Sequence, residues 1–435
     1  MGRSRECRLA VRTVTRKSCR YARRAGISQG HDHDFDHRRR RTGDHRLRAR
    51  HLRPSPRPAP RQGQPDRPHR HRRESGGRPE LVRLADEVGE LDFTDADACV
   101  AWARARAERE PIEAVLAFRE YAVVAAAEVA AALGLPGNPP EAVRRVRTKD
   151  VCREYLRERG FRQPALRLCA SAAEAEEFHR SVGGTVIVKP RSGSSSEGVQ
   201  QVDDPAGIAA AFAQARDEDG HALVETFVSG PEFSVEGIIT SGSPQVLAVT
   251  GKQVVGTSFV ECGHTMPAPI APEDTDAITE EVANALRALG LRHGLFHVEC
   301  WLTDQGVVLG ELHVRQGGDW IHAMVEWTRP GLELYGSWLD DLLGRPVQLP
   351  AAARGAATRF LTPPPGTVDS VRGWAELAAR PEVLAASCEL APGTEIRPIA
   401  SNLERYGVVV VGTAEPEAAG PLADKLLAEL DIRLR

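Results

Sequence analysis

The sequence predicts a protein of mixed α/β and α+β class, and three patterns carry this prediction. First, short apolar runs alternate with helical segments between residues 88 and 159. Second, two apolar runs are joined by the turn sequence 303–306, which predicts an antiparallel hairpin. Third, strand-like runs alternate with glycine turns over residues 351–435, as in a small α+β lobe. A length of 435 residues is enough for about two to four domains.

The pattern of residues 77–140 predicts only part of a domain of alternating strands and helices. The expected elements are a strand at 88–93, a helix capped by Thr94 and running to about 108, a buried strand at 112–118, a helix at 121–133 and a helix from 139 to about 159. Such alternation is typical of a parallel sheet. A nucleotide-type sheet would begin with one more strand and a glycine-rich turn, which we do not find upstream. We therefore expect a truncated domain at 77–140, a larger domain at 141–350 and the lobe at 351–435.

Residues 1–76 differ in composition from the rest of the chain. They hold 22 Arg and one Lys against seven Asp and Glu, so their net charge is +16 and the remainder carries −19. They have too few apolar side chains to offset the entropy of ordering, so we expect a disordered tail. Three interpretations stay open: a basic arm for nucleic acid, a metal-binding His–Asp run at 31–37, or a GC-rich segment read in the wrong frame. A nucleic-acid partner is poorly supported, because only Tyr21 and Phe35 could stack on bases.

Composition argues against several other classes. No apolar run near either terminus approaches the roughly 20 residues of a membrane helix, and the Arg-rich start lacks the apolar stretch of a signal peptide. The eight cysteines form no CxxC pair, so zinc and redox motifs are unsupported. We expect a cytoplasmic protein with reduced cysteines and no membrane partner.

A candidate phosphate site follows the strand 185–190. This strand ends in Lys189, and the glycine- and serine-rich loop 191–199 comes directly after it. Successive N–H groups of such a loop can bind phosphate oxygens, and Lys189 would add a cation. The loop matches neither the P-loop pattern nor GxGxxG, so a mobile surface turn is the competing interpretation.

Two further stretches place carboxylates at strand ends. Glu225 and Glu232 flank a Gly–Pro turn, where they are either solvated or part of a nucleotide pocket. In the hairpin around 303–306, Glu299 and Glu311 can face each other, with His313 on the same side as Glu311. Two such carboxylates would repel unless a cation lay between them, which favours a divalent metal bridging ATP phosphates. The competing interpretation is a wet polar face of the hairpin.

Over residues 79–435 these motifs together resemble the ATP-grasp superfamily, and within it the amino-acid ligases that join carboxylates to amines. The matching stretches are 147–149, 188–190, the loop 191–198, Glu225 with 230–232, the segment 259–267, 297–299 and 311–319. The resemblance implies an ATP-grasp fold with a truncated Rossmann-like N-terminal domain and a small C-terminal α+β lobe.

The resemblance also implies an ATP site. Lys149 and Lys189 would contact the phosphates, and the mobile loop with Ser194, Ser195 and Ser196 would close over them. Adenine would lie against Glu225, Thr226, Phe227 and Val228, and ribose against Glu232. Glu299 and Glu311 would bind Mg²⁺, with His313 in the third metal position. The family usually has Asn there, so either His313 stands aside or Mn²⁺ serves better than usual.

The implied reaction is an ATP-dependent ligation. A carboxylate, that of an amino acid, would be activated as an acyl phosphate and joined to an amine, with release of ADP and phosphate. Arg315 would stabilise the acyl phosphate and the tetrahedral centre, and Glu261 and His264 would line the amino-acid pocket. A formate-using purine-synthesis ligase and a non-catalytic ATP-binding regulator are the alternatives. The partners would be small molecules, and the resemblance allows a homodimer.

Overall fold

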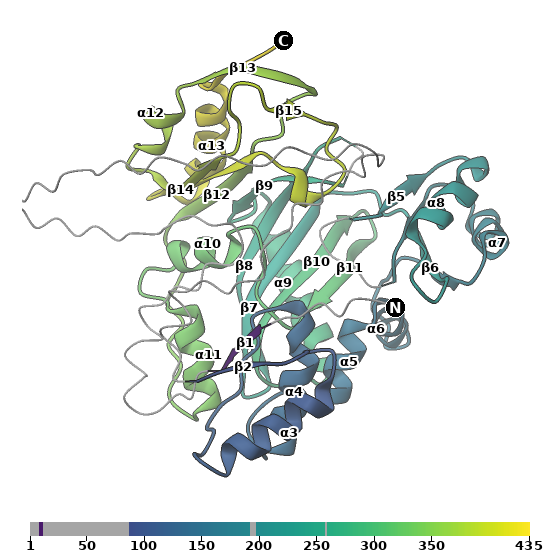
Figure 1. The fold of residues 1–435 in the computed structure, drawn as a ribbon, viewed down its shortest axis with the longest axis vertical. Helices are drawn as coiled ribbons and strands as arrows, with labels where there is room; N and C mark the ends of the chain where they lie inside the picture. The colour runs from purple at the N-terminus through teal and green to yellow at the C-terminus, as the bar shows by residue number, and fades with distance from the viewer. Residues whose placement is uncertain (1–7, 12–86, 192–196, 257–258) are drawn as a thin grey trace, which may run out of the picture.

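The computed structural model describes residues 8–11, 87–191, 197–256 and 259–435. Its centre is an eight-stranded sheet in the order β11-β10-β7-β8-β9-β12-β16-β14 (Figure 1). The strands of this main sheet are β7 (Glu232–Thr240), β8 (Ser243–Val254), β9 (Glu261–Met266), β10 (Gly294–Thr303), β11 (Gly306–His313), β12 (Gly355–Phe360), β14 (Val383–Cys388) and β16 (Gly407–Thr413). Every strand pairing in the described part of the chain is antiparallel, so the expected parallel sheet is wrong.

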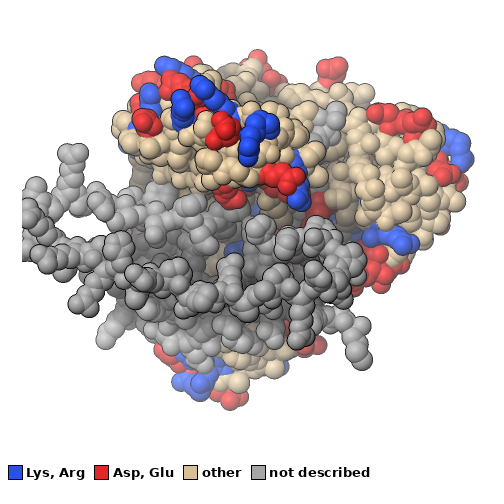
Figure 2. Space-filling model, turned by 45° about the horizontal axis from the view of Figure 1, so that its top comes forward, with Lys and Arg blue, Asp and Glu red and all other residues tan. Residues whose placement is uncertain are grey.

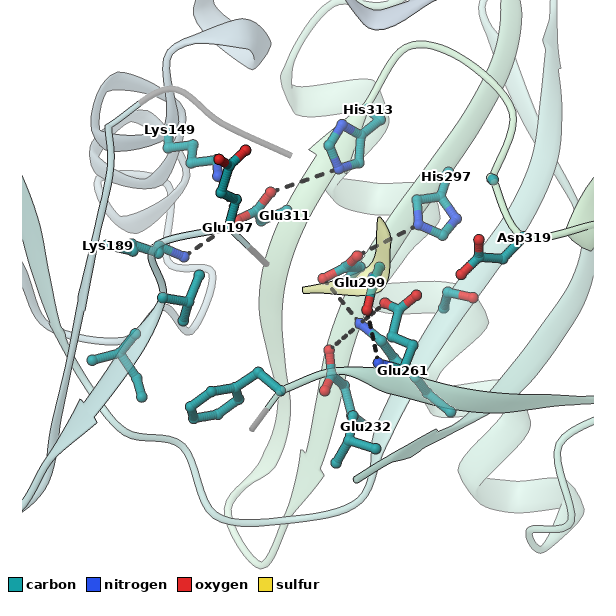
Figure 3. A pocket seen from close by; sticks show the side chains of 18 of the residues that line it. Lys149, Lys189, Glu197, Glu232, Glu261, His297, Glu299, Glu311, His313 and Asp319 are labelled. Carbon is teal, nitrogen blue, oxygen red and sulfur yellow. Dashed lines mark hydrogen bonds and ion pairs between the residues drawn. The ribbon is translucent and has the colours of Figure 1, made fainter. Parts of the chain in front are cut away.

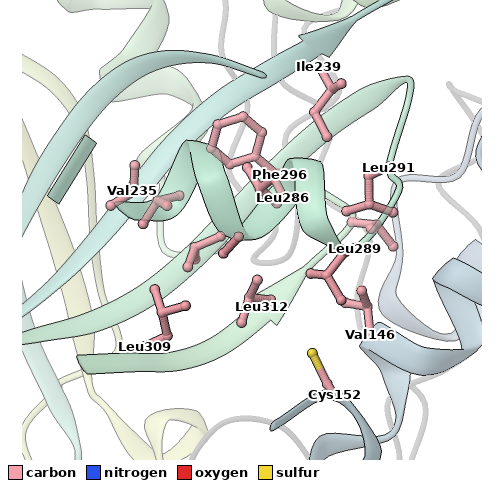
Figure 4. Close-up of a cluster of buried hydrophobic side chains, with 14 of the residues drawn as sticks. Val146, Cys152, Val235, Ile239, Leu286, Leu289, Leu291, Phe296, Leu309 and Leu312 are labelled. Carbon is pink, nitrogen blue, oxygen red and sulfur yellow. The ribbon is translucent and has the colours of Figure 1, made fainter. Parts of the chain in front are cut away.

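One face of the main sheet carries the apolar cluster drawn in Figure 4, and a second cluster with α10 (Ile321–Thr328) and α11 (Leu334–Leu342) lies on the other face. Along β10, Phe296, Val298 and Cys300 point to the face of the Figure 4 cluster, where α9 (Pro272–Ala288) covers the sheet. Leu286 and Leu289, at the end of that helix, pack against them. The intervening residues, among them His297 and Glu299, point to the opposite face and line a cleft. This alternation follows from the two-residue repeat of a strand, and it separates the apolar core from the polar site.

The N-terminal part has the two expected helices and part of the strand expected at 88–93, but it lacks the second expected strand. Helices α3 (Ala96–Ala107) and α4 (Val123–Ala132), with the 3-10 turn Glu120–Ala122, form this region, and only β2 (Glu87–Glu90) is a strand. Asp95, not Thr94, caps α3, because its side chain accepts the Ala98 N–H. The expected strand at 112–118 is wrong. Its residues form no strand ladder here, and Ala114 and Ala117 pack into two different apolar clusters.

The long helix expected from 139 to 159 is divided in two. Helix α5 (Pro140–Arg147) ends at Thr148, whose φ of −103° and ψ of 98° are not helical, and α6 (Lys149–Arg157) begins directly after it. The Thr148 hydroxyl and the Thr148 N–H both donate to the Arg144 carbonyl at the end of α5. The break places Lys149 in the first turn of α6, at the edge of the cleft.

A second, four-stranded sheet projects from the main body on the right of Figure 1. It has the order β3-β6-β4-β5, and α7 (Ala172–Val182) and α8 (Ile208–Ala215) pack on it. Its strands are β3 (Leu166–Cys169), β4 (Val186–Lys189), β5 (Gln200–Val202) and β6 (Ala222–Thr226). The Gly230–Pro231 turn therefore connects two different sheets, since β6 lies in this one and β7 in the main sheet.

Three strands of the C-terminal part, β12, β14 and β16, are hydrogen-bonded into the main sheet. The C-terminal part is therefore continuous with the main sheet and does not form a separate lobe. A smaller sheet of β13 (Gly366–Arg372), β15 (Glu395–Ile396) and β17 (Asp431–Leu434) adjoins it. Helices α12 (Trp374–Ala378) and α13 (Ala419–Ala428) belong to this part, and α10 (Ile321–Thr328) and α11 (Leu334–Leu342) precede it. In Figure 2, positive and negative side chains lie intermixed on this upper part of the molecule.

Most of the expected tail lies outside the described residues, so its disorder and its three interpretations stay predictions. Within it, β1 (Arg8–Val11) pairs with β2, contrary to the expected lack of secondary structure there. None of the helices in the described ranges is long and apolar enough to cross a bilayer.

Candidate active site

A cleft of about 710 Å³ separates the four-stranded sheet from the polar face of the main sheet. Figure 3 shows its side chains, with lysines from α6 and β4 facing glutamates and histidines from β10 and β11. All the predicted site residues that the structure describes line this cleft. They are Lys149, Lys189, Glu225, Thr226, Phe227, Val228, Glu232, Glu261, His264, Glu299, Glu311, His313 and Arg315. Ser194, Ser195 and Ser196 lie outside the described residues.

Two lysines converge on one carboxylate. Lys149 Nζ lies 2.8 Å from Glu311 Oε1, and Lys189 Nζ lies 3.3 Å from the same oxygen. Lys189 also pairs with Glu225 at 2.8 Å. Burial alone would lower the pKa of Lys189, but Glu225 and Glu311 outweigh it and raise the pKa. Burial likewise opposes ionisation of Glu311, yet the two lysines hold its pKa well below the ordinary value. The side chains of two lysines therefore meet at the Glu311 carboxylate, near the end of β11.

A third lysine, Lys252 on β8, is surrounded by three glutamates. Its Nζ lies 2.6 Å from Glu232, 2.8 Å from Glu261 and 3.4 Å from Glu299. Burial works against its charge, but the three carboxylates raise its pKa well above the ordinary value. One cation cannot neutralise three carboxylates, and the pKa of Glu232 is raised by burial and by its acidic neighbours. This part of the cleft is therefore suited to a further positive charge.

The two histidines of the β10–β11 hairpin are each anchored by a carboxylate. His297 Nδ1 lies 2.8 Å from Glu236 Oε1, and His313 Nδ1 lies 3.0 Å from Glu120 Oε2. Their Nε2 atoms face Glu299 at 3.6 Å and Glu311 at 3.8 Å. Burial would lower the pKa of His297, but Glu236 and Glu299 raise it to about 10. His297 is thus a cation that holds Glu299 in place.

Arg315 is held by the same carboxylate as His313. Its Nε donates to Glu120 Oε2, and its Nη1 donates to the Gln316 carbonyl at 2.7 Å. Arg147 contacts the other oxygen of Glu120 at 2.7 Å. Burial opposes ionisation of Glu120, but His313, Arg315 and Arg147 together lower its pKa. Glu120 therefore fixes the positions of a candidate metal ligand and a candidate catalytic arginine at once.

A cluster of two carboxylates and a histidine also lines the cleft, and we call it the acidic cluster. Ligand atoms of Glu261, His264 and Asp319 lie within 4.8 Å of one another. Arg405 holds both oxygens of Asp319, at 2.7 and 2.8 Å. Burial opposes ionisation of Asp319, but the contact with His264 and the hydrogen bonds from Arg405 lower its pKa well below the ordinary value. His264 is almost fully buried.

The donor set of the hairpin fits a divalent metal beside ATP phosphates. Burial opposes ionisation of Glu299 and Glu311, but neighbouring cations lower the pKa of both, so both are ionised oxygen donors. In the structure their charge is balanced by Lys252 on one side and by Lys149 with Lys189 on the other. The expected repulsion is thus relieved by lysines. Figure 3 shows His313 beside Glu311 and His297 beside Glu299, each pair joined by a dashed line.

Several residues of the site were missed by sequence reasoning. Lys252 could have been noticed, because it is the one charged residue in the strand run 243–254. Glu120, Glu236 and Arg405 gave no local signal, since each acts on a partner far away in the chain. Asp319 stood in a matching stretch, but its link to Arg405 could not be read from spacing.

Three family models match the chain. The ATP-grasp N-terminal domain matches residues 70–137, the ATP-grasp domain residues 182–324, and the L-amino acid ligase C-terminal domain 2 residues 359–435. The crystal structure of an L-amino acid ligase from Bacillus licheniformis superimposes with a TM-score of 0.66 and 25% identity, over 79% of this chain and 86% of that one. The N5-carboxyaminoimidazole ribonucleotide synthetase from Thermotoga maritima, at 18% identity and a TM-score of 0.57, shares the fold over 79% of this chain and 87% of its own.

Sequence relatives agree with these structures. The uncharacterized protein y4rH of Sinorhizobium fredii is 25% identical over 79% of this chain and 73% of its own length. The D-alanine–D-alanine ligase of Sodalis glossinidius is 30% identical over 45% of this chain and 57% of its own length. That of Corynebacterium urealyticum is 28% identical over 39% of this chain, which spans half of that ligase.

Fold, cleft and matches define the class: the chain is an ATP-grasp protein of the carboxylate–amine ligase family. Within this class, residues 359–435 match the L-amino acid ligase C-terminal domain 2. The ATP-grasp fold expected from the sequence is confirmed, with a C-terminal α+β part. The Rossmann-like character of the N-terminal region is not seen, because its described residues are mainly helical. The exact domain limits stay predictions.

Proposed function

We propose that this protein activates the carboxylate of an amino acid with ATP and joins it to an amine, releasing ADP and phosphate. The observation that carries the proposal is the convergence of Lys149 and Lys189 on Glu311. Two cations beside one ionised carboxylate provide the charges that a terminal phosphate and its metal need.

In the proposed reaction the substrate carboxylate oxygen attacks the γ-phosphorus, and the bond to the β–γ bridging oxygen breaks. Lys149 and Lys189 bind the phosphate oxygens, and Thr226 to Val228 hold adenine at the edge of β6. Glu299 and Glu311 would hold Mg²⁺ or Mn²⁺, which would neutralise phosphate charge when bound. The protein itself forms no covalent bond in this step, because phosphoryl transfer is catalysed mainly by positioning the reactants and by stabilising charge.

The second step is attack of the amine on the acyl phosphate. The nitrogen adds to the acyl carbon, loses a proton, and phosphate leaves. Arg315 would stabilise the negative oxygens that form there, and Glu120 keeps its guanidinium in place. The acidic cluster of Glu261, His264 and Asp319 supplies acceptors for the ammonium group of an amino acid.

The nucleotide product tests this proposal. Purified protein is incubated with ATP, Mg²⁺ and pairs of amino acids, and the nucleotides are separated by chromatography. The acyl-phosphate route predicts ADP and phosphate in amounts equal to the ligated product. AMP and pyrophosphate would show an acyl-adenylate route and would refute the mechanism. ADP formation without any ligated product in the whole panel would refute the ligase assignment. The cytoplasmic location and the homodimer stay predictions.

A further inference from the structure

A short segment of the C-terminal part reaches into the cleft. Of the described residues beyond 321, only Asn402, Leu403 and Arg405 line it. They belong to the 3-10 turn Asn402–Glu404 and the residue after it, and we call residues 402–405 the C-terminal segment. The chain thus brings a turn that lies more than 80 residues after Asp319 back to the same cavity.

Side chains of the C-terminal segment form hydrogen bonds with both the N–H and the carbonyl of Glu261. The Glu261 N–H donates to Asn402 Oδ1 at 2.9 Å, and the Glu261 carbonyl accepts from Arg405 Nη1 at 3.1 Å. Arg405 also binds Asp319 and stacks on the Phe360 ring at 3.5 Å. Both carboxylates of the acidic cluster are therefore positioned by this segment, and Arg405 is a positioning residue for them.

An apolar wall lies next to this cluster. Leu403 is 55% exposed and Val254 is 38% exposed, yet both line the cleft. Val254 is the ladder partner of Glu261, and Leu403 follows the Asn402 that binds the Glu261 N–H. Val254 is therefore a direct neighbour of Glu261, and Leu403 lines the same cleft next to the residue that binds the Glu261 N–H. Exposed apolar surface of this kind gains free energy when an apolar group covers it.

We propose that Leu403, with Val254, selects an aliphatic side chain on the amino-acid substrate. This inference rests on the proposed function. The ammonium group of the substrate binds at Glu261, His264 and Asp319, and its side chain lies against Leu403. An acidic cluster beside an apolar wall matches an amino acid such as leucine. A charged side chain would lose hydration against that wall without gaining a partner there.

The test uses Leu403→Ala, with Val151→Ala as the matched control. Val151 is 44% exposed and, of the five large exposed apolar residues in the described chain, is the one that does not line the cleft. Leucine and glycine are compared by the thermal shift they cause in the presence of ADP and Mg²⁺, and by kcat/KM. We expect Leu403→Ala to lose about 10-fold in the leucine-to-glycine ratio of kcat/KM, with the KM for ATP unchanged. Val151→Ala should behave as the wild type.

The outcomes separate the inference from the proposed function. An unchanged leucine-to-glycine ratio in Leu403→Ala overturns the inference while leaving the ligase intact. So does a wild-type protein that leucine fails to stabilise, or one that prefers charged side chains. If no pair of amino acids is ligated, the proposed function fails, and the thermal shift alone decides: leucine stabilisation lost in Leu403→Ala supports the apolar wall, and stabilisation retained overturns it.

Discussion

At the scale of single residues, the site depends on carboxylates that organise cations. Glu120 contacts His313, Arg315 and Arg147, and Glu236 holds His297. Partners of this kind fix side-chain orientation, and their loss typically costs about 10–100-fold in activity or metal affinity where they support a metal ligand. The reactive groups are therefore only part of the machinery.

Removing the charge of Glu120 tests this role. Glu120→Gln should lower kcat by about 10–100-fold with the KM for ATP little changed, because Arg315 and His313 lose their common anchor while the lysines stay. Steady-state kinetics with ATP and amino acids varied separately would measure it. Glu120→Asp, which keeps the charge, should recover part of kcat. A Glu120→Gln protein with wild-type kcat would contradict the positioning role.

Arg315 itself should act on the transition state. Arg315→Ala removes a cation from the site of developing negative charge, which typically costs about 10²–10³ in rate, on the order of 3–4 kcal/mol. We expect kcat to fall by that factor and ATP affinity, measured by calorimetry, to change little. A variant whose main defect is weaker ATP binding would place Arg315 on the nucleotide instead.

At the scale of elements, the hairpin and the helix break build the site. The turn 303–306 joins β10 and β11 as the sequence predicts, and this brings His297 opposite His313 in the ladder. The register shifts between Val298 and Cys300, so Glu299 lies at an irregularity rather than in a regular pair. The break at Thr148 could not be predicted from helix propensity, because a threonine costs a helix little and tertiary contacts decide.

Helix α10 contains a buried histidine, His322, that makes the stability of the folded protein depend on pH. Burial lowers the pKa of His322 from 6.5 to about 4, so the folded protein keeps it neutral. Between these values the unfolded chain binds a proton that the folded chain does not, and stability therefore falls as the pH falls. The slope contributed by this group approaches about 1.4 kcal/mol per pH unit. Denaturant unfolding of wild type and His322→Asn from pH 7 to pH 4 should show a flatter profile for the variant. Identical profiles would contradict this assignment.

At the scale of the whole molecule, one sheet spans the ATP-grasp and C-terminal parts. Strand β9 pairs with β8 on one side and with β12 on the other, and Arg359 on β12 donates to the His264 carbonyl at 3.0 Å. The domain boundary expected at residue 350 stays a prediction. The hydrogen-bonded main sheet contains strands from both sides of this position.

Truncation after Pro350 should consequently disrupt the fold. Loss of β12, β14 and β16 leaves β9 as an edge strand and exposes apolar side chains that pack against these strands, such as Met266 and Met324. We expect the truncated protein to be insoluble or aggregated, which size-exclusion chromatography would show. We expect the full chain to unfold in a single cooperative transition of the main sheet, which circular dichroism would follow. A monomeric truncated protein with a native spectrum would show that the C-terminal part is independent.

The sequence by itself determined the class of this protein. Local patterns placed Lys189 at a strand end, Glu299 and Glu311 in one hairpin, and Glu225 and Glu232 around a Gly–Pro turn, because a lysine-ended strand or a hairpin turn is a short-range property of the chain. The tertiary structure decided the rest. It made the sheets antiparallel, left 112–118 without a strand, and brought Glu120, Lys252 and Arg405 to the cleft. These outcomes depend on contacts between segments up to about 200 residues apart, such as Glu120 with Arg315, and no local propensity contains that information.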